Sequence, residues 1–274
     1  MVKPFADAGM DVHFYPVYFD EGLKQETDLT CDVLFLMDYF GYTGNKPDLT
    51  GYRGNVIRDV THSLFSETYD DADFCFGSLR KWCGVYTGGF AWAKDGKRLT
   101  HGAADTSSYA KLREEAMRGK SFYISGSTSD KSYLNTFGEA EELLETVGIS
   151  AAEERDVYLA RRLDAELIRS KRRENAKILM DAFPELLVFP DAKETDCPMF
   201  VPILVPDGKR DALRRYLIEH EIYCPIHWPL SELHHIDAKS KILYDNGLSL
   251  VCDQRYEQKD MLRIAETIRA FWKE

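Results

Sequence analysis

The sequence has no long apolar run, no excess of basic residues and no low-complexity tract. A membrane-spanning helix needs about 18 or more consecutive apolar residues, and no such run occurs. The N-terminal MVKPFADAGM also lacks the apolar centre of a secretory signal peptide. The formal net charge is -11, which argues against nucleic acid and against an anionic membrane surface as partners.

The cysteines are not paired in the sequence, because no CxxC spacing occurs. Several of them lie inside apolar runs, which is typical of reduced, buried thiols in a cytoplasmic protein. The sequence therefore predicts neither a disulfide framework nor a metal site. The apolar content of 44% and the charged content of 30% are those of a globular protein with a sizeable core.

Two short apolar runs in the stretch from Asn55 to Trp92 are typical of buried strands in a parallel sheet: Val56-Ile57 and Phe74-Cys75-Phe76. Ligands of open α/β sheets bind outside the carboxyl ends of the strands, so the polar residues that follow each run are expected to gather at one edge. These residues are Asp59, Thr61, His62 and Ser63 after the first run, and Ser78, Arg80 and Lys81 after the second.

An acid, a histidine, a serine and a lysine at one sheet edge suit pyridoxal 5'-phosphate (PLP). This cofactor carries a basic ring nitrogen, an acidic ring hydroxyl, a phosphate and an aldehyde. A lysine amine forms the Schiff base with the aldehyde, and an aspartate holds the proton on the ring nitrogen.

Each of these residues also has an ordinary structural interpretation. Position alone favours a surface lysine at a strand end for Lys81, and Asp59 is compatible with an N-cap for residues 61–65. His62 would then be a partly buried histidine bonded to a carbonyl, and Ser78 a loop serine. The ordered combination of DxxH, SxxK and GGF, each at a strand end, favours the cofactor site over the separate structural roles.

Hydrophobic periodicity divides the chain into a large domain over residues 1–150, a connecting helix over 151–183 and a small α+β domain over 184–274. The pattern Ser150-Ala151-Ala152-Glu153 resembles a capping box, and Pro184 ends the helix that it opens. Further strands are predicted at 11–18, 33–37, 88–93, 186–189, 199–205, 222–226 and 248–252. Further helices are predicted at 5–9, 107–118, 130–147, 207–220 and 258–272.

Four segments resemble the DegT/DnrJ/StrS family of PLP-dependent sugar aminotransferases: VIRDVTHSLFS, GSLRKWCGVYTGGFAW, YCPIHWP and CDQRYEQKDMLRIAETI. The resemblance implies an α/β protein of fold type I. It consists of a truncated large domain with a mainly parallel sheet and a small C-terminal α+β domain. The family usually has a further segment of roughly a hundred residues at the front, with a loop that cradles the phosphate at a helix N-terminus. We therefore expect a fragment, a wrongly started reading frame or a naturally shortened member.

The resemblance also implies roles for the cofactor residues. Lys81 would form the Schiff base, Asp59 would pair with the pyridine nitrogen, and His62 would contact the ring hydroxyl. Ser78 would bond the phosphate, although many members have their serine five positions before the lysine rather than three.

Three further residues are implied in substrate binding. His227 and Trp228 would line the substrate pocket, and Arg255 would hold a donor carboxylate or make a structural ion pair.

The implied activity is transfer of an amino group from glutamate to a keto-sugar through a Lys81 Schiff base, in a cytoplasmic homodimer without a metal. A PLP-dependent dehydratase is compatible with the same residues. The alternative is a catalytically impaired scaffold or binding subunit that lacks the phosphate-binding loop.

Overall fold

The computed structural model describes the chain except for residues 1, 68–70, 97–104, 147, 228–235 and 274. The chain divides into two compact units, each formed from more than one segment. Unit 1 consists of Met1–Ile57, His62–Asp71 and Ala165–Glu274, and unit 2 consists of Arg58–Thr61 and Ala72–Asp164. The boundaries predicted at residues 150 and 183 stay a prediction.

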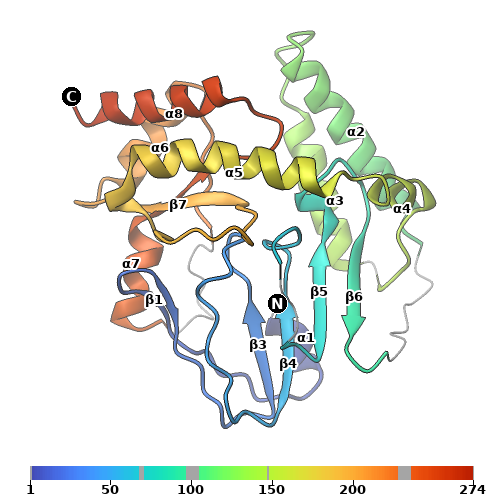
Figure 1. Cartoon of the computed structure of the whole chain (residues 1–274). Helices are drawn as coiled ribbons and strands as arrows, with labels where there is room; N and C mark the ends of the chain where they lie inside the picture. The colour runs from blue at the N-terminus through green and yellow to red at the C-terminus, as the bar shows by residue number, and fades with distance from the viewer. Residues whose placement is uncertain (1, 68–70, 97–104, 147, 228–235, 274) are drawn as a thin grey trace. The chain divides into compact units, whose positions relative to one another are not determined.

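A four-stranded sheet has the strand order β3-β4-β5-β6. Its strands are β3 (Val33–Met37), β4 (Asn55–Asp59), β5 (Phe74–Ser78) and β6 (Gly89–Ala93). Strands β3, β4 and β5 run in the same direction (Figure 1), and β6 pairs antiparallel with β5, with Ser78 opposite Gly89. The predicted α/β class with a mainly parallel sheet is confirmed, and the predicted strands at 33–37, 56–57, 74–76 and 88–93 all lie in this sheet.

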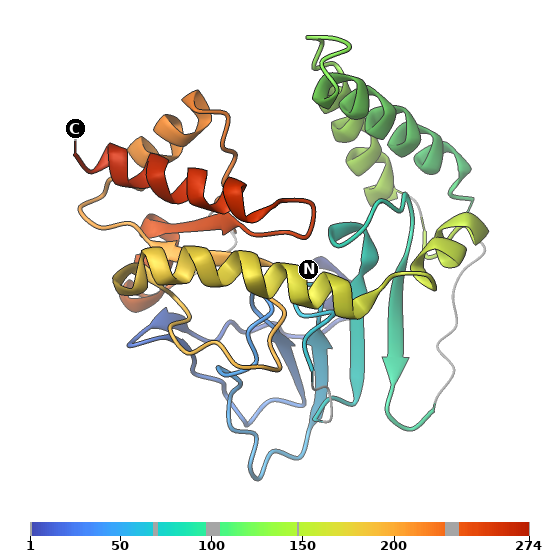
Figure 2. The ribbon, with the colours of Figure 1, turned by 45° about the horizontal axis from the view of Figure 1, so that its top comes forward.

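Unit 2 continues from β6 into helices. The pair α2 (Ser107–Ile124) and α3 (Tyr133–Thr146) forms a helical hairpin, which Figure 2 shows from above in green. Ala116 of α2 and Ala140 of α3 are fully buried. The short helix α4 (Glu154–Ala160) follows.

The C-terminal part of unit 1 is an α+β core. Strands β7 (Phe200–Leu204) and β8 (Gly247–Val251) pair antiparallel. The helices described in this part are α5 (Ala165–Ala182), α6 (Arg210–Glu219), α7 (Ala238–Asn246) and α8 (Gln258–Phe271). The core is formed by fully buried apolar side chains from both strands and from α5, α6 and α8. Each of these helices turns toward the core the apolar face that its periodicity predicts. These residues include Leu179, Val201, Ile203, Leu213, Leu217, Leu250, Met261 and Ile268.

The front of unit 1 begins with α1 (Val2–Asp7), followed by Gly9 at φ 77°, as the predicted helical turn closed by glycine requires. A small antiparallel hairpin of β1 (Val17–Phe19) and β2 (Leu23–Gln25) comes next. A second apolar cluster joins this hairpin to later parts of unit 1 through Leu23, Phe40, Tyr42, Val188 and Phe189.

The single connecting helix predicted over 151–183 is wrong. The chain forms α4 and α5 with a break between them, where Arg162 N and Leu163 N bond the carbonyls of Leu159 and Ala160 in tight turns. Asp164 directly precedes α5, and aspartate is a preferred residue type at a helix start. The predicted capping box is also absent, because the N-cap of α4 is Glu153 and its side chain makes no cap bond.

Three predicted strands differ from the structure. Only residues 17–18 of the predicted strand 11–18 pair, as part of β1, and residues 222–226 form no regular strand. Residues 186–189 form a single bridge between Leu187 and Ile203. The helix α7 was not predicted, because Ser240 is its one buried residue and the segment has no clear apolar face.

Within the described residues, none of the helices combines the length and the apolar character that crossing a bilayer requires. The same residues contain no group of three or more His, Cys, Asp and Glu side chains placed to hold a metal ion.

Candidate active site at the ends of β4 and β5

Asp59 is the last residue of β4 and is 6% exposed. Its Oδ1 accepts a hydrogen bond of 2.8 Å from the backbone N of Thr61. The chain therefore turns sharply directly after the strand, with the carboxylate held inside the turn. Burial of a carboxylate is costly unless donors or a cation face it.

Thr61 connects the end of β4 to the end of β5. Its Oγ1 accepts a hydrogen bond of 3.2 Å from Ser78 N, and its carbonyl accepts one of 2.6 Å from Trp82 Nε1. Trp82 is 2% exposed, so this bond lies in the core of unit 2. Hydrogen bonds of Thr61 thus connect the strand end that carries the predicted acid to the strand end that precedes the predicted lysine.

Lys81 ends a single 3-10 turn, η1 (Leu79–Lys81), that follows β5 directly. The carbonyl of Leu79 accepts hydrogen bonds from Trp82 N at 3.0 Å and Cys83 N at 3.2 Å, so the backbone on both sides of Lys81 is fixed. The Lys81 side chain is exposed, and its amine makes no hydrogen bond or ion pair with any residue of the described ranges.

Arg80 and Lys81 are neighbours in this turn, but only Arg80 has partners among the described residues. Arg80 donates to Tyr109 Oη at 2.5 Å and pairs with Glu141 at 3.0 Å, so its role is structural. The side chain of Ser78 makes no cap bond to η1. Within the described residues, the Lys81 amine after β5 has no partner and the Ser78 hydroxyl makes no cap bond, while a buried carboxylate ends β4.

His62 and His227 lie in one aromatic cluster of unit 1. Their ring centroids are 5.6 Å apart, and the Phe40 ring is 5.5 Å from His62 and 5.1 Å from His227. His62 is 4% exposed. A hydrogen bond of 2.9 Å joins His227 Nδ1 to Ser249 Oγ, which orients the imidazole.

The loop after β3 supports this cluster. Phe40 has a positive φ of 56° and Gly41 one of 88°, and an alanine Cβ at Gly41 would overlap the carbonyl of Cys197. The Gly41 carbonyl accepts from Ser66 Oγ at 2.7 Å and from Cys197 N at 3.2 Å. Close contact between two backbone segments thus requires glycine here.

Arg255 forms a two-pronged ion pair with Asp253, with Nε 3.0 Å from Oδ1 and Nη2 2.5 Å from Oδ2. Burial by itself would raise the pKa of Asp253, but the hydrogen bonds and the charge of Arg255 outweigh it and lower this pKa. The hydrogen bond to Asp253 in turn raises the pKa of Arg255. This contact fits the structural ion pair that was one of the two interpretations of Arg255.

Trp228 lies outside the described residues. Of the other predicted residues, the structure connects Asp59, Ser78 and the Lys81 turn through Thr61, and it joins His62 to His227. Sequence reasoning placed Thr61 among the polar residues after the first apolar run but gave no role to it, to Trp82 or to Ser249. The position of Trp82, directly after Lys81, was a signal that could have pointed to it.

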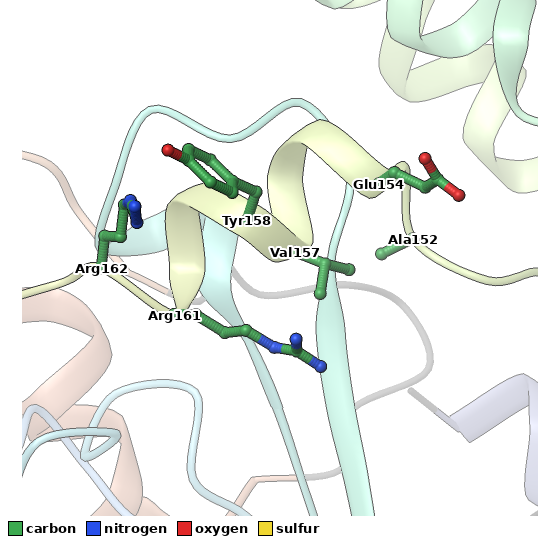
Figure 3. Close-up of a pocket in the computed structure, with 6 residues that line it drawn as sticks. All are labelled: Ala152, Glu154, Val157, Tyr158, Arg161 and Arg162. Atoms are coloured by element: carbon green, nitrogen blue, oxygen red, sulfur yellow. The ribbon is translucent and has the colours of Figure 1, made fainter.

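Two surface hollows lie on α4 in the described part of unit 2. One of about 370 Å³ is lined by Ala152, Glu154, Val157, Tyr158, Arg161 and Arg162, as Figure 3 shows. The second, of about 300 Å³, reaches Leu79, Gly88 and Gly89. Neither is lined by Asp59, Ser78 or Lys81, so the chemistry of the side chains and not the hollows places the candidate site.

The fold is shared with solved aminotransferase structures. An aminotransferase of the DegT DnrJ EryC1 StrS group from Brucella abortus is 16% identical with a TM-score of 0.55, over 86% of this chain and 63% of that chain. The sugar aminotransferase CalS13 from Micromonospora echinospora is 14% identical with a TM-score of 0.61, over 98% of this chain and 76% of that chain. The PLP-form of Spr1654 from Streptococcus pneumoniae is 13% identical with a TM-score of 0.56, over 89% of this chain and 69% of that chain.

No protein-family model and no curated protein sequence matches the chain. The chain spans less than two thirds of the length of the Brucella abortus structure. At these identities the likeness establishes architecture. The chain therefore has the fold of the DegT/DnrJ/StrS aminotransferases, PLP-dependent transferase fold type I, as the sequence motifs implied.

Proposed function

We propose that the protein is a PLP-dependent aminotransferase of the DegT/DnrJ/StrS type in which Lys81 carries the cofactor. One observation supports this most directly. The exposed amine of Lys81, which has no partner among the described residues, follows β5, the buried carboxylate of Asp59 ends β4, and Thr61 bonds these two strand ends together. The shared fold with aminotransferases supports the same assignment.

The residues present fit PLP. Asp59 is a buried acid whose negative charge would attract a ring-nitrogen cation, and the Ser78 hydroxyl is not used in capping η1. Asp59 would hold the ring nitrogen, Ser78 the phosphate and His62 the ring hydroxyl. The PLP-form of Spr1654 has the same fold, which supports the choice of cofactor.

The side chains of this chain would divide the work as follows. PLP, when bound, supplies an electron-accepting ring that stabilises negative charge on the substrate's α carbon. Asp59 would keep the ring nitrogen protonated through its negative charge. Lys81 would hold the cofactor through its amine and would act as the base that accepts and returns the proton at the substrate's α carbon. The fixed backbone of η1 keeps that amine in place for both tasks.

The proposed substrates are glutamate as amino donor and a keto-sugar as acceptor. The protein is proposed to act as a homodimer in the cytoplasm. Solved structures with this fold include sugar aminotransferases, which supports the acceptor class. His227 and Trp228 would line the pocket for the sugar. The donor carboxylate would bind Arg255 only if that guanidinium also leaves Asp253, so the ion pair argues against this role.

The test is attachment of PLP to Lys81. The purified chain is mixed with PLP, its visible absorption is recorded, and the adduct is fixed with borohydride and located by peptide mass spectrometry. We expect modification at Lys81 and its loss in Lys81→Ala. Lys111→Ala, which removes an exposed lysine on α2, should leave it unchanged.

Two results would refute the proposal. Equal modification of the parent chain and Lys81→Ala would show that the lysine is wrongly assigned. Absence of any adduct in the parent chain would favour the scaffold or binding subunit instead.

A further inference from the structure

Asp156 on α4 is a buried carboxylate to which the cofactor assignment gives no role. It is 2% exposed. Its Oδ2 accepts three hydrogen bonds, from Tyr86 N at 3.1 Å, Thr87 N at 2.6 Å and Thr87 Oγ1 at 2.7 Å. A fourth bond of 2.9 Å runs from Glu153 N to Thr87 Oγ1. A single carboxylate thus fixes residues 86–87 from a distant part of the sequence, with charge-assisted bonds.

Thr87 is directly connected to the Lys81 turn. The next residue, Gly88, accepts a hydrogen bond of 3.3 Å from Leu79 N through its carbonyl, and Leu79 begins η1. After it, Gly89 pairs with Ser78 across β5 and β6. The loop from Leu79 to Gly88 is therefore closed by hydrogen bonds, and Lys81 lies inside it.

The loop has two anchors at opposite ends. Trp82 Nε1 holds it to Thr61, next to Asp59, and Asp156 holds it at Thr87. One anchor alone would leave the other half of the loop free to move. The Lys81 amine has no partner of its own in the described residues, so the backbone is what sets its position.

We infer that Asp156 is a positioning residue, which holds the 79–88 loop so that the Lys81 amine stands where the cofactor aldehyde can reach it. The inference rests on the proposed role of Lys81. It assigns a function to α4, a helix that the sequence predicted only as the start of a connecting helix. It also gives a role to a carboxylate that is buried in unit 2 and accepts three hydrogen bonds from residues 86–87.

The first measurement is hydrogen exchange at the amides of Leu79, Trp82 and Cys83, without added PLP. Asp156→Ala removes all three bonds to the loop, and we expect these amides to exchange about tenfold faster or more. Asp156→Asn can still accept hydrogen bonds through its amide oxygen, so its exchange rates at these amides should lie between those of Asp156→Ala and those of the parent. Ala140→Gly on α3 is the matched control, because it weakens a buried site of unit 2 that makes none of these bonds.

The second measurement is the affinity for PLP and the fraction fixed at Lys81 by borohydride, at a temperature where all variants are folded. Asp156→Ala should bind PLP about tenfold more weakly, with partial recovery in Asp156→Asn. Ala140→Gly should lower the melting temperature and leave the affinity unchanged. If Asp156 had a merely structural role, Asp156→Ala and Ala140→Gly would both lower the melting temperature, and their affinities for PLP would be the same.

The inference is overturned if Asp156→Ala exchanges at these amides like the parent, or binds PLP at Lys81 like the parent. Failure of the proposed function looks different, because the parent itself would then give no adduct at Lys81. In that case the exchange rates alone decide whether Asp156 holds the loop.

Discussion

Arg255 and Asp253 show how one residue supports two interpretations until its contacts are known. The guanidinium bonds both oxygens of a carboxylate that is 11% exposed, while its own side chain is 66% exposed. Solvent screens the outer partner, so this pair contributes less than a fully buried one. The buried partner is nevertheless left in a costly environment if the arginine is removed.

We expect Arg255→Gln to lower the free energy of unfolding at pH 7 by about 1 kcal/mol, because Asp253 stays charged without its cation. The folded-state pKa of Asp253 is lowered, so the stabilisation is present above the unfolded pKa and is lost as pH falls through the folded value. Urea unfolding at pH 7 and at pH 3 measures both effects. An unchanged stability together with a raised KM for the amino donor would instead assign Arg255 to substrate binding.

Among single residues, Asp59 and Lys81 were predicted as site residues from their places after apolar runs in the sequence. The structure puts Asp59 at the end of β4 and Lys81 one turn after β5. The bonds of Thr61 and Asp156 could not be predicted, because both join segments that are distant in sequence and neither leaves a periodic signal. Only the three-dimensional contacts reveal such residues.

Gly41 is the point where the loop after β3 passes the backbone of Cys197. We expect Gly41→Ala to destabilise the protein by about 3 kcal/mol more than Gly51→Ala, measured by thermal or urea unfolding. Both glycines have a similar positive φ, of 88° and 85°, so backbone strain is matched. Gly51 has no atom within 4 Å of the added Cβ, whereas at Gly41 the Cβ overlaps a carbonyl. Equal costs would show that the close approach to Cys197 is not rigid.

The elements could be predicted where an apolar run or a clear stripe is long enough to be unambiguous. The run VLFLM forms β3 over the residues expected, and the stripe of α8 matches its buried side. The predicted helix boundaries were wrong where a tertiary contact determines where a helix ends. Asp156 holds α4 to residues 86–87, whereas Ile168 and Leu179 of α5 are buried in unit 1, and the sequence between these helices contains neither Gly nor Pro to mark the break.

Three buried thiols make unit 1 sensitive to alkali. Burial raises the pKa of Cys197 to about 11 and those of Cys224 and Cys252 to about 12, from 9.0. A raised folded-state pKa gives stability that is present below pH 9 and is lost as pH rises toward the folded value.

We expect the free energy of unfolding to fall above pH 9 by up to about 1.4 kcal/mol per pH unit for each thiol. The combined replacement Cys197→Ala, Cys224→Ala and Cys252→Ala should flatten this slope. Urea unfolding between pH 7 and pH 11 measures the slope. An identical slope in the triple variant would contradict the prediction.

The two units are interleaved along the chain, since unit 1 contains residues from both before and after all of unit 2. During synthesis on the ribosome, every residue of unit 2 has been made once Asp164 emerges, but unit 1 cannot close until the segment from Ala165 onward has followed. A nascent chain therefore exposes the apolar side chains of Leu23, Phe40 and Tyr42 until Val188 and Phe189 arrive to cover them. Capture of these side chains by chaperones is therefore most favoured in the interval before Phe189 has been made.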